Sequence, residues 1–276
     1  MNRLLWTTLV FSVSVSTVFS EPLKVQIETR DKKFYSGLLS NRSAGSVDFQ
    51  PIGAAAPVQI PDAQINQMKF SVPDSQEEEI AQLFANGQYD QVLQKSTAVL
   101  SPFLPYSNIP SNLTPAYLRW MIACFWAGDF DQAEKLSKSL AQLPGDELSP
   151  ALRFYNKLIG LEKGDFQTMQ TFLQTPEAEA LYPESSAARL YIKARLLQNK
   201  KEYNSALRTA ALLIALHSTD ADWMPMTELL CAKLYAQLNM PESAESVLAD
   251  INEFYSEPQV KKRAAALAAA MNGEKR

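Results

Sequence analysis

Apolar and polar residues alternate along the first part of the chain, in short runs that are separated by polar turns. An alternation with a period of two is typical of β-strands that bury one face. Five such strands with tight turns, within about fifty residues, favour a small barrel or a rolled sheet. The runs predict strands over residues 23–29, 34–39, 47–49, 58–60 and 65–72.

The pattern changes at Pro73. From there on, apolar residues recur every three to four positions, which is the spacing of a helix that buries one face. Ser75 is followed closely by three glutamates, and this order is typical of a capped helix start. Strand-like alternation does not return. We therefore divide the chain into a small β-rich module at residues 21–72 and a helical domain at 73–276.

A short segment recurs five times in the helical part, each time between two amphipathic runs. In its clearest copy a glycine, Gly128, is followed two positions later by an aromatic residue, Phe130, and three positions after that by a small residue, Ala133. Glycine suits the left-handed backbone that ends a helix, an aromatic ring fills the space where two helices meet, and a small residue lets them pack closely. Successive copies lie 41, 36, 37 and 38 residues apart, so they predict five helical hairpins. The aromatic position holds Tyr89, Phe130, Phe166 and Tyr203, and Pro241 takes it in the last copy. The small position holds Ala133, Ala206 and Ala244, with Val92 and Met169 in the other two copies.

This Gly-x-aromatic-x-x-Ala arrangement resembles the tetratricopeptide repeat, a helical hairpin of about 34 residues. The resemblance covers residues 75–257, and Ala194 and Ala232 match the small residue of the repeat's first helix. It implies a mainly α fold, a right-handed solenoid of helical hairpins, preceded by the small β-barrel-like module. Residues 258–271 predict a closing helix that caps the stack. An unrelated helical bundle is the alternative.

The β-rich module resembles SH3-like and Sm-like barrels in two details. It has a charged hairpin at residues 29–32, and its second strand carries a Phe-x-x-Gly pattern from Phe34 to Gly37. This resemblance covers residues 23–72 and implies a small barrel.

Residues 1–20 have the layout of a secretory signal peptide. Arg3 supplies a basic start, an apolar stretch follows, and modest side chains precede Glu21, so cleavage after Ser20 is expected. An uncleaved anchor is the alternative, although the apolar stretch is short for a membrane span. We therefore expect an exported protein, periplasmic or secreted, with no stable membrane span after cleavage.

Charge and cysteine content narrow the function further. The expected mature chain holds 25 Lys and Arg against 30 Asp and Glu, and its basic run is 261–263 near the end. Nucleic-acid binding needs clustered cations, so it is disfavoured. Cys124 and Cys231 lie 107 residues apart, each in an apolar helical pattern. We expect buried free thiols, with a disulfide between them as the alternative.

Residues that could carry catalysis are sparse. His217 is the single histidine, and its place after an apolar helical run suits a helix C-terminus. One histidine and two distant cysteines do not make a conventional zinc site, and the sequence has no glycine-rich phosphate loop. The carboxylates fall on predicted helix faces and turns. We therefore predict no catalytic residue, no metal and no cofactor; a facing pair of carboxylates, which would make the protein an enzyme, is the alternative.

The resemblance to tetratricopeptide repeats also implies a binding function. In such stacks the first helix of each hairpin lines a groove that holds a peptide or a partner's helix. An apolar half of the groove followed by a half with two cations would suit an extended segment with an acidic end. The alternative role of the aromatic positions is core packing between hairpins. The positions expected to line the groove are Phe125, Phe154, Tyr191, Arg195 and Lys233.

We therefore expect an exported, non-catalytic scaffold or adaptor that binds a protein or peptide partner through its helical repeats. The first alternative is a module that recognises polysaccharide or cell-wall material through its β part. Exposure of Phe34 and Tyr35 would favour that alternative. The second alternative is an enzyme of unfamiliar type.

Overall fold

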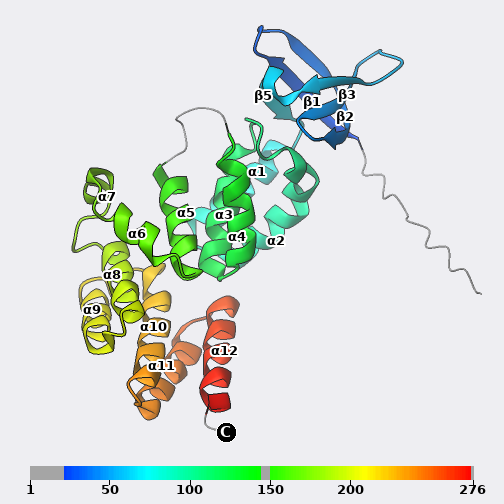
Figure 1. Ribbon diagram of the computed structural model, residues 1–276. Helices are drawn as coiled ribbons and strands as arrows, with labels where there is room; N and C mark the ends of the chain where they lie inside the picture. The colour runs from blue at the N-terminus through cyan, green and yellow to red at the C-terminus, as the bar shows by residue number, and fades with distance from the viewer. Residues whose placement is uncertain (1–21, 144–149, 275–276) are drawn as a thin grey trace, which may run out of the picture.

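The computed structural model of the protein describes residues 22–143 and 150–274 (Figure 1). A small β-sheet at the N-terminal end is followed by a curved stack of helices, so the expected mainly α fold with a preceding β module is confirmed. The expected signal peptide, residues 1–20, lies outside the described residues.

The sheet contains five antiparallel strands in the order β4-β3-β2-β1-β5. The strands confirm the five runs of alternating residues, because apolar side chains from every strand face one core. Ile60 of β4 and Met68 of β5, from the two edge strands, also belong to that core. The strands are β1 (Leu23–Thr29), β2 (Phe34–Ser43), β3 (Ser46–Pro51), β4 (Val58–Pro61) and β5 (Ile65–Phe70), with a 3₁₀ turn η1 (Asp62–Gln64) before the last.

The outer edge of β5 is covered by a segment of the helical domain. The Met68 N–H donates to the Pro110 carbonyl at 2.8 Å, and the Asn112 N–H donates to the Met68 carbonyl at 3.2 Å. The Asn112 side chain adds two more bonds, accepting from the Phe70 N–H at 2.9 Å and donating to the Phe70 carbonyl at 3.3 Å. The Phe70 ring also packs on Phe103, with ring centroids 4.9 Å apart. These bonds join the module to the helices through backbone pairing as well as side-chain packing.

The helical domain is built from five pairs of consecutive helices, which confirms the expected hairpins in the part of the chain that the structure describes. The pairs are α1 (Asp74–Ala85) with α2 (Tyr89–Leu100), α3 (Thr114–Ala127) with α4 (Phe130–Leu140), α5 (Pro150–Glu162) with α6 (Phe166–Phe172), α8 (Ala187–Asn199) with α9 (Tyr203–Leu216), and α10 (Trp223–Gln237) with α11 (Pro241–Phe254). A 3₁₀ helix η2 (Ser101–Tyr106) and a short α7 (Pro176–Leu181) occupy two of the connections, and α12 (Pro258–Glu274) closes the stack as expected.

One local expectation was wrong. Helix α1 begins at Asp74 with Pro73 at its N-cap, and no side chain caps it. Ser75 therefore lies inside the first turn, because Pro73 already fixes the backbone where the helix begins.

The five hairpin turns share one backbone geometry. Each second helix begins at the repeated aromatic position or at Pro241, and two residues earlier the backbone is left-handed. Glycine adopts this backbone without strain and asparagine tolerates it, whereas the lysine is strained. The small or apolar residue three positions into each second helix is buried in all five hairpins. The left-handed residues are Gly87, Gly128, Gly164, Lys201 and Asn239, with φ of 68°, 79°, 100°, 62° and 58°.

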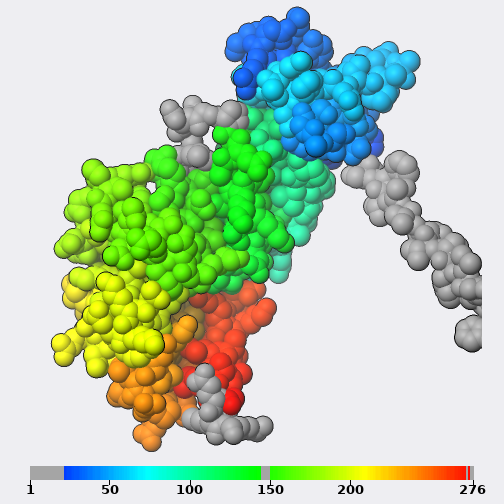
Figure 2. All heavy atoms as spheres, viewed as in Figure 1, coloured from blue at the N-terminus to red at the C-terminus, as the bar shows by residue number. Residues whose placement is uncertain are grey.

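The stack bends until its two ends touch. The Tyr89 hydroxyl of the first hairpin donates to Asp222 Oδ1, at the start of the fifth, at 2.8 Å. Figure 2 shows α12, in red, against the green surface of the earlier hairpins. The guanidinium of Arg263, on α12, lies 5.7 Å from the centre of the Phe130 ring on α4.

Five aromatic rings, one from each hairpin, meet where the stack bends. We call this group the aromatic cluster. Trp126 is its centre, since its ring contacts three of the others and its indole N–H donates to the Tyr155 hydroxyl at 3.0 Å. The inner face of the stack is therefore core at this point. The members are Tyr89, Trp126, Tyr155, Tyr191 and Trp223.

Candidate functional site

The cysteines and the histidine occupy structural positions. Cys124 on α3 and Cys231 on α10 are free and buried, which confirms the expected thiols and excludes a disulfide between them. Burial raises the pKa of both thiols to about 12, so they are unreactive at neutral pH. His217 stands at the C-cap of α9, and its Nε2 lies 2.6 Å from the Ser185 carbonyl oxygen.

Three of the five residues expected to line a binding groove lie in the core instead. Phe125, Phe154 and Tyr191 are all buried. Phe154 stacks on Tyr182 with ring centroids 3.9 Å apart, and Tyr191 belongs to the aromatic cluster. The reason is the tight bend of the stack, which brings the inner faces of neighbouring first helices into contact. These rings therefore fix the shape of the domain and present little surface to a partner.

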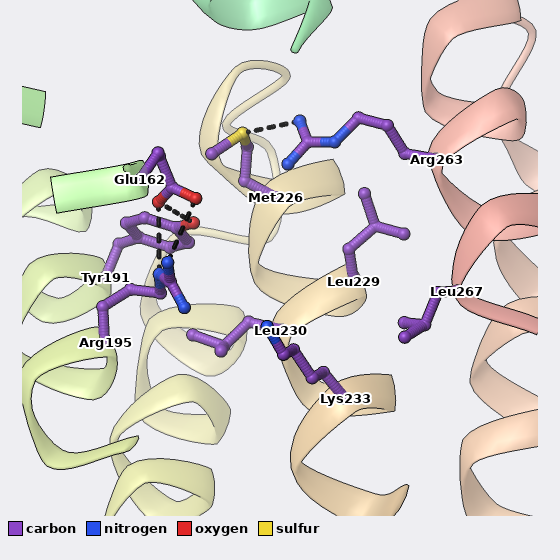
Figure 3. Close-up of a pocket in the computed structure, with 9 residues that line it drawn as sticks. All are labelled: Glu162, Tyr191, Arg195, Met226, Leu229, Leu230, Lys233, Arg263 and Leu267. Carbon is purple, nitrogen blue, oxygen red and sulfur yellow. Dashed lines mark hydrogen bonds and ion pairs between the residues drawn. The ribbon is translucent and has the colours of Figure 1, made fainter. Parts of the chain in front are cut away.

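The other two expected residues, Arg195 and Lys233, meet in a pocket between α8, α10 and α12 (Figure 3). We call it the basic pocket, and its volume is about 230 Å³. Lys233 extends from α10 toward the Arg195 side, while Arg263 reaches in from α12. The walls between the charged groups are apolar. They are formed by Met226, Leu229, Leu230 and Leu267, with the buried Tyr191 behind.

Arg195 is held in place by Glu162, the last residue of α5. Its Nε and Nη2 lie 3.2 Å from the two carboxylate oxygens, so the pair is bidentate. The Tyr191 hydroxyl donates to the same carboxylate at 2.8 Å. Both charged side chains are nearly buried, 11% and 8% exposed. This cation is therefore compensated inside the fold.

Lys233 and Arg263 have no such compensation. Neither forms an ion pair with any residue that the structure describes. The Arg263 guanidinium instead contacts the Met226 sulfur at 3.1 Å, and a thioether is a weak acceptor. Partial burial of its ammonium group lowers the pKa of Lys233, the neighbouring Arg195 lowers it further, and Glu162 opposes the shift. The basic pocket thus carries a surplus of two positive charges, which suits an anionic ligand.

Two charged residues of the basic pocket were not expected from the sequence. Glu162 ends a first helix, and Arg263 belongs to the basic run 261–263 of the closing helix. The basic run indicates a cationic surface on the closing helix, but it does not indicate which other helices this surface will meet. Only the closing of the stack brings α12 against α8 and α10.

Within residues 22–143 and 150–274, no group of three or more His, Cys, Asp or Glu could hold a metal ion. No helix in the same ranges is long and apolar enough to cross a membrane.

Comparisons with known proteins leave the family open. No protein-family model and no curated protein matches the chain. Among solved structures, a chain titled "MamA MSR-1 C2" aligns over 71% of this chain and 97% of its own length. The identity is 14% and the TM-score 0.35, a likeness too distant to indicate a shared family or function.

Proposed function

We propose that the protein is an exported, non-catalytic adaptor with a tetratricopeptide-like stack, and that it binds an acidic segment of a protein partner in the basic pocket. The uncompensated Lys233 and Arg263 carry this proposal. Two cations that share one pocket repel each other until an anion enters between them.

The chemistry of the pocket favours a carboxylate on a protein over a free anion. Apolar walls of methionine and leucine surround the cations. A peptide segment can place methylene groups against those walls and a carboxylate between Lys233 and Arg263, and charge-assisted hydrogen bonds would then form. The volume of about 230 Å³ suits one or two side chains. Arg195 also contributes to the positive electrostatic potential of the pocket, and it can do so while it remains paired with Glu162.

The tetratricopeptide-like architecture is supported by the five hairpin turns. Each turn combines a left-handed residue with an aromatic or proline helix start, and a buried small or apolar residue follows. A stack of such hairpins commonly serves protein recognition rather than chemistry.

The binding proposal is tested by reversing one charge. Lys233→Glu should abolish capture of specific partners from an extract of the native host, while the thermal midpoint stays nearly unchanged because Lys233 is exposed. Lys262→Glu is the matched control, since Lys262 is also exposed and does not line the pocket. Captured proteins are quantified by mass spectrometry. A partner list that is the same for both variants removes the basic pocket from the function.

Export is tested separately. The sequence layout supports cleavage after Ser20, so the mature protein isolated from outside the cytoplasm should begin at Glu21. Intact-mass measurement decides this, and a chain that retains Met1 would overturn it.

A second candidate function is recognition of polysaccharide by the β module. The favouring observation is that Phe34 and Tyr35 are 63% and 38% exposed. They are consecutive in β2 and so face opposite sides of the sheet, where each offers a single ring rather than a shared platform. Sedimentation with insoluble cell-wall material tests this function. Binding that survives both Phe34→Ala and Tyr35→Ala would exclude these rings.

A further inference from the structure

A second pocket adjoins the basic pocket. Its volume is about 470 Å³, and it lies where the first hairpin turn meets the starts of α10 and α12. Met226 and Arg263 line both pockets, so the two lie on either side of this pair. We call the second one the acidic pocket. The residues that give it its character are Tyr89, Asp90, Trp126, Asp222, Glu257 and Gln259.

The acidic pocket holds three carboxylates, and Arg263 at its border is the one cation that lines it. Asp90, Asp222 and Glu257 form no ion pair with any residue in the described ranges. Gln259 donates to the Asp90 carboxylate from its side chain and its backbone, but one oxygen of Asp90, Oδ1, is buried and lacks a hydrogen-bond partner among the described residues. A buried carboxylate oxygen without a donor is costly, so a ligand with N–H groups would relieve it.

Burial raises the pKa of Asp222, and the neighbouring Asp220 raises it further. Burial also raises the pKa of Asp90; the hydrogen bonds from Gln259 oppose this shift, and the charge of Glu257 adds to it. Both shifts have the sign expected of partly buried carboxylates that have another carboxylate nearby.

The remaining wall is aromatic. The Tyr89 ring stacks on Trp126 with centroids 6.2 Å apart, and the Tyr89 hydroxyl fixes the Asp222 carboxylate at 2.8 Å. A lysine or arginine side chain has methylene groups that suit such a wall and a charged end that suits the carboxylates. The acidic pocket therefore matches a cationic side chain in both its parts.

We infer that the acidic pocket receives a lysine or arginine side chain of the same partner segment whose carboxylate enters the basic pocket. The inference rests on the function proposed for the basic pocket. The partner it selects is a segment that carries both charges, because a wholly acidic tail that extended past Arg263 would meet three carboxylates.

The experiment uses an array of short peptides of randomised sequence, probed with the full labelled protein. The wild-type protein should enrich peptides that hold an acidic and a basic residue at a constant separation. Asp90→Asn with Glu257→Gln should lower the enrichment of the basic residue about fivefold, the size of one ion pair near the surface. It should leave the acidic preference intact. Glu253→Gln is the matched control, since Glu253 is an exposed residue of α11 outside the pocket.

The outcomes separate the two claims. Enrichment of acidic residues alone by the wild-type protein overturns the inference and leaves the proposed function standing. Lack of any acidic preference overturns the proposed function as well. A basic preference that persists in the double variant assigns it to another surface and also overturns the inference.

Discussion

The hairpin turns of the helical domain and the inner faces of its first helices are built in opposite ways. Every turn repeats one set of features, namely a left-handed residue, a helix start two positions later and a buried residue beyond. The residues on the inner faces do not follow a comparable repeated pattern. At the bend of the stack, four aromatic residues of first helices meet Tyr89, the turn aromatic of the first hairpin, in one cluster.

The difference shows which interactions act within a hairpin and which act across the stack. A turn is stabilised by contacts between residues close in sequence, so each copy needs the same solution. The bend depends on contacts between hairpins, and the cluster joins the first hairpin to the fifth. Both pockets depend on the bend, and the first hairpin turn also supplies part of the wall of the acidic pocket.

Removal of the central ring should have the largest effect. Trp126→Ala is expected to lower the free energy of unfolding by about 3–5 kcal/mol, the usual cost of emptying a buried aromatic site. Trp126 is 8% exposed and contacts rings from three other hairpins. Urea denaturation measures the change, with Trp126→Phe as a milder control. A loss below about 1 kcal/mol would mean that the cluster does not hold the bend.

The ring at a turn should matter less. Phe130 and Tyr203 are only half-buried at the starts of α4 and α9. Phe130→Ala and Tyr203→Ala should therefore each cost about 2 kcal/mol, below the cost at a fully buried aromatic site. The same denaturation experiment compares them with Trp126→Ala. If either turn variant proved more damaging than Trp126→Ala, the ranking of turn and bend would be reversed.

The turns can also be improved. Lys201 adopts φ of 62°, a left-handed backbone that is strained in a residue with a Cβ. Lys201→Gly should raise the free energy of unfolding by about 0.5–1 kcal/mol, after the extra entropy of the unfolded glycine chain is subtracted. Gly164→Ala, at the equivalent turn with φ of 100°, is the mirror test and should destabilise. If the turns share one geometry, the free energy of unfolding must rise in Lys201→Gly and fall in Gly164→Ala.

The smallest effect concerns the charge of Asp222, which accepts a hydrogen bond from Tyr89 where the two ends of the stack meet. The raised pKa of Asp222 means that the folded protein holds this proton more tightly than the unfolded chain does. The wild type therefore loses stability as the pH rises through that pKa. Asp222→Asn keeps an oxygen that can accept from Tyr89 and carries no charge, so it should be slightly more stable than wild type at pH 7. Thermal melts should show the difference vanishing below about pH 4; a variant less stable at pH 7 would contradict the assigned sign.

The strands and hairpins could be predicted because their signals are local. The alternation from Leu23 to Thr29 predicts a strand by itself, and Gly128 with Phe130 predicts a turn. The basic pocket could be predicted only in part. Arg195 and Lys233 fall at matching places on neighbouring first helices, and the structure brings them together.

The remainder depends on the bend. Glu162 and Arg263 enter the pocket because α5 and α12 converge on it, and no pattern within either helix encodes that meeting. The same cause explains why the predicted groove aromatic Phe154 is core. A repeat pattern defines the unit, while the contacts between units define the surface that remains open.

The uncovered edge of the sheet has a consequence for concentrated solutions. Strand β5 is covered by the segment around Asn112, whereas β4 has β3 as its one neighbour in the sheet as described. Pro57 precedes β4 and Pro61 ends it, and proline has no backbone N–H. A strand from a second molecule would find no donor at either end of this short edge. Assembly of the modules into fibrils through this edge is therefore opposed by two residues that contribute nothing to the pockets.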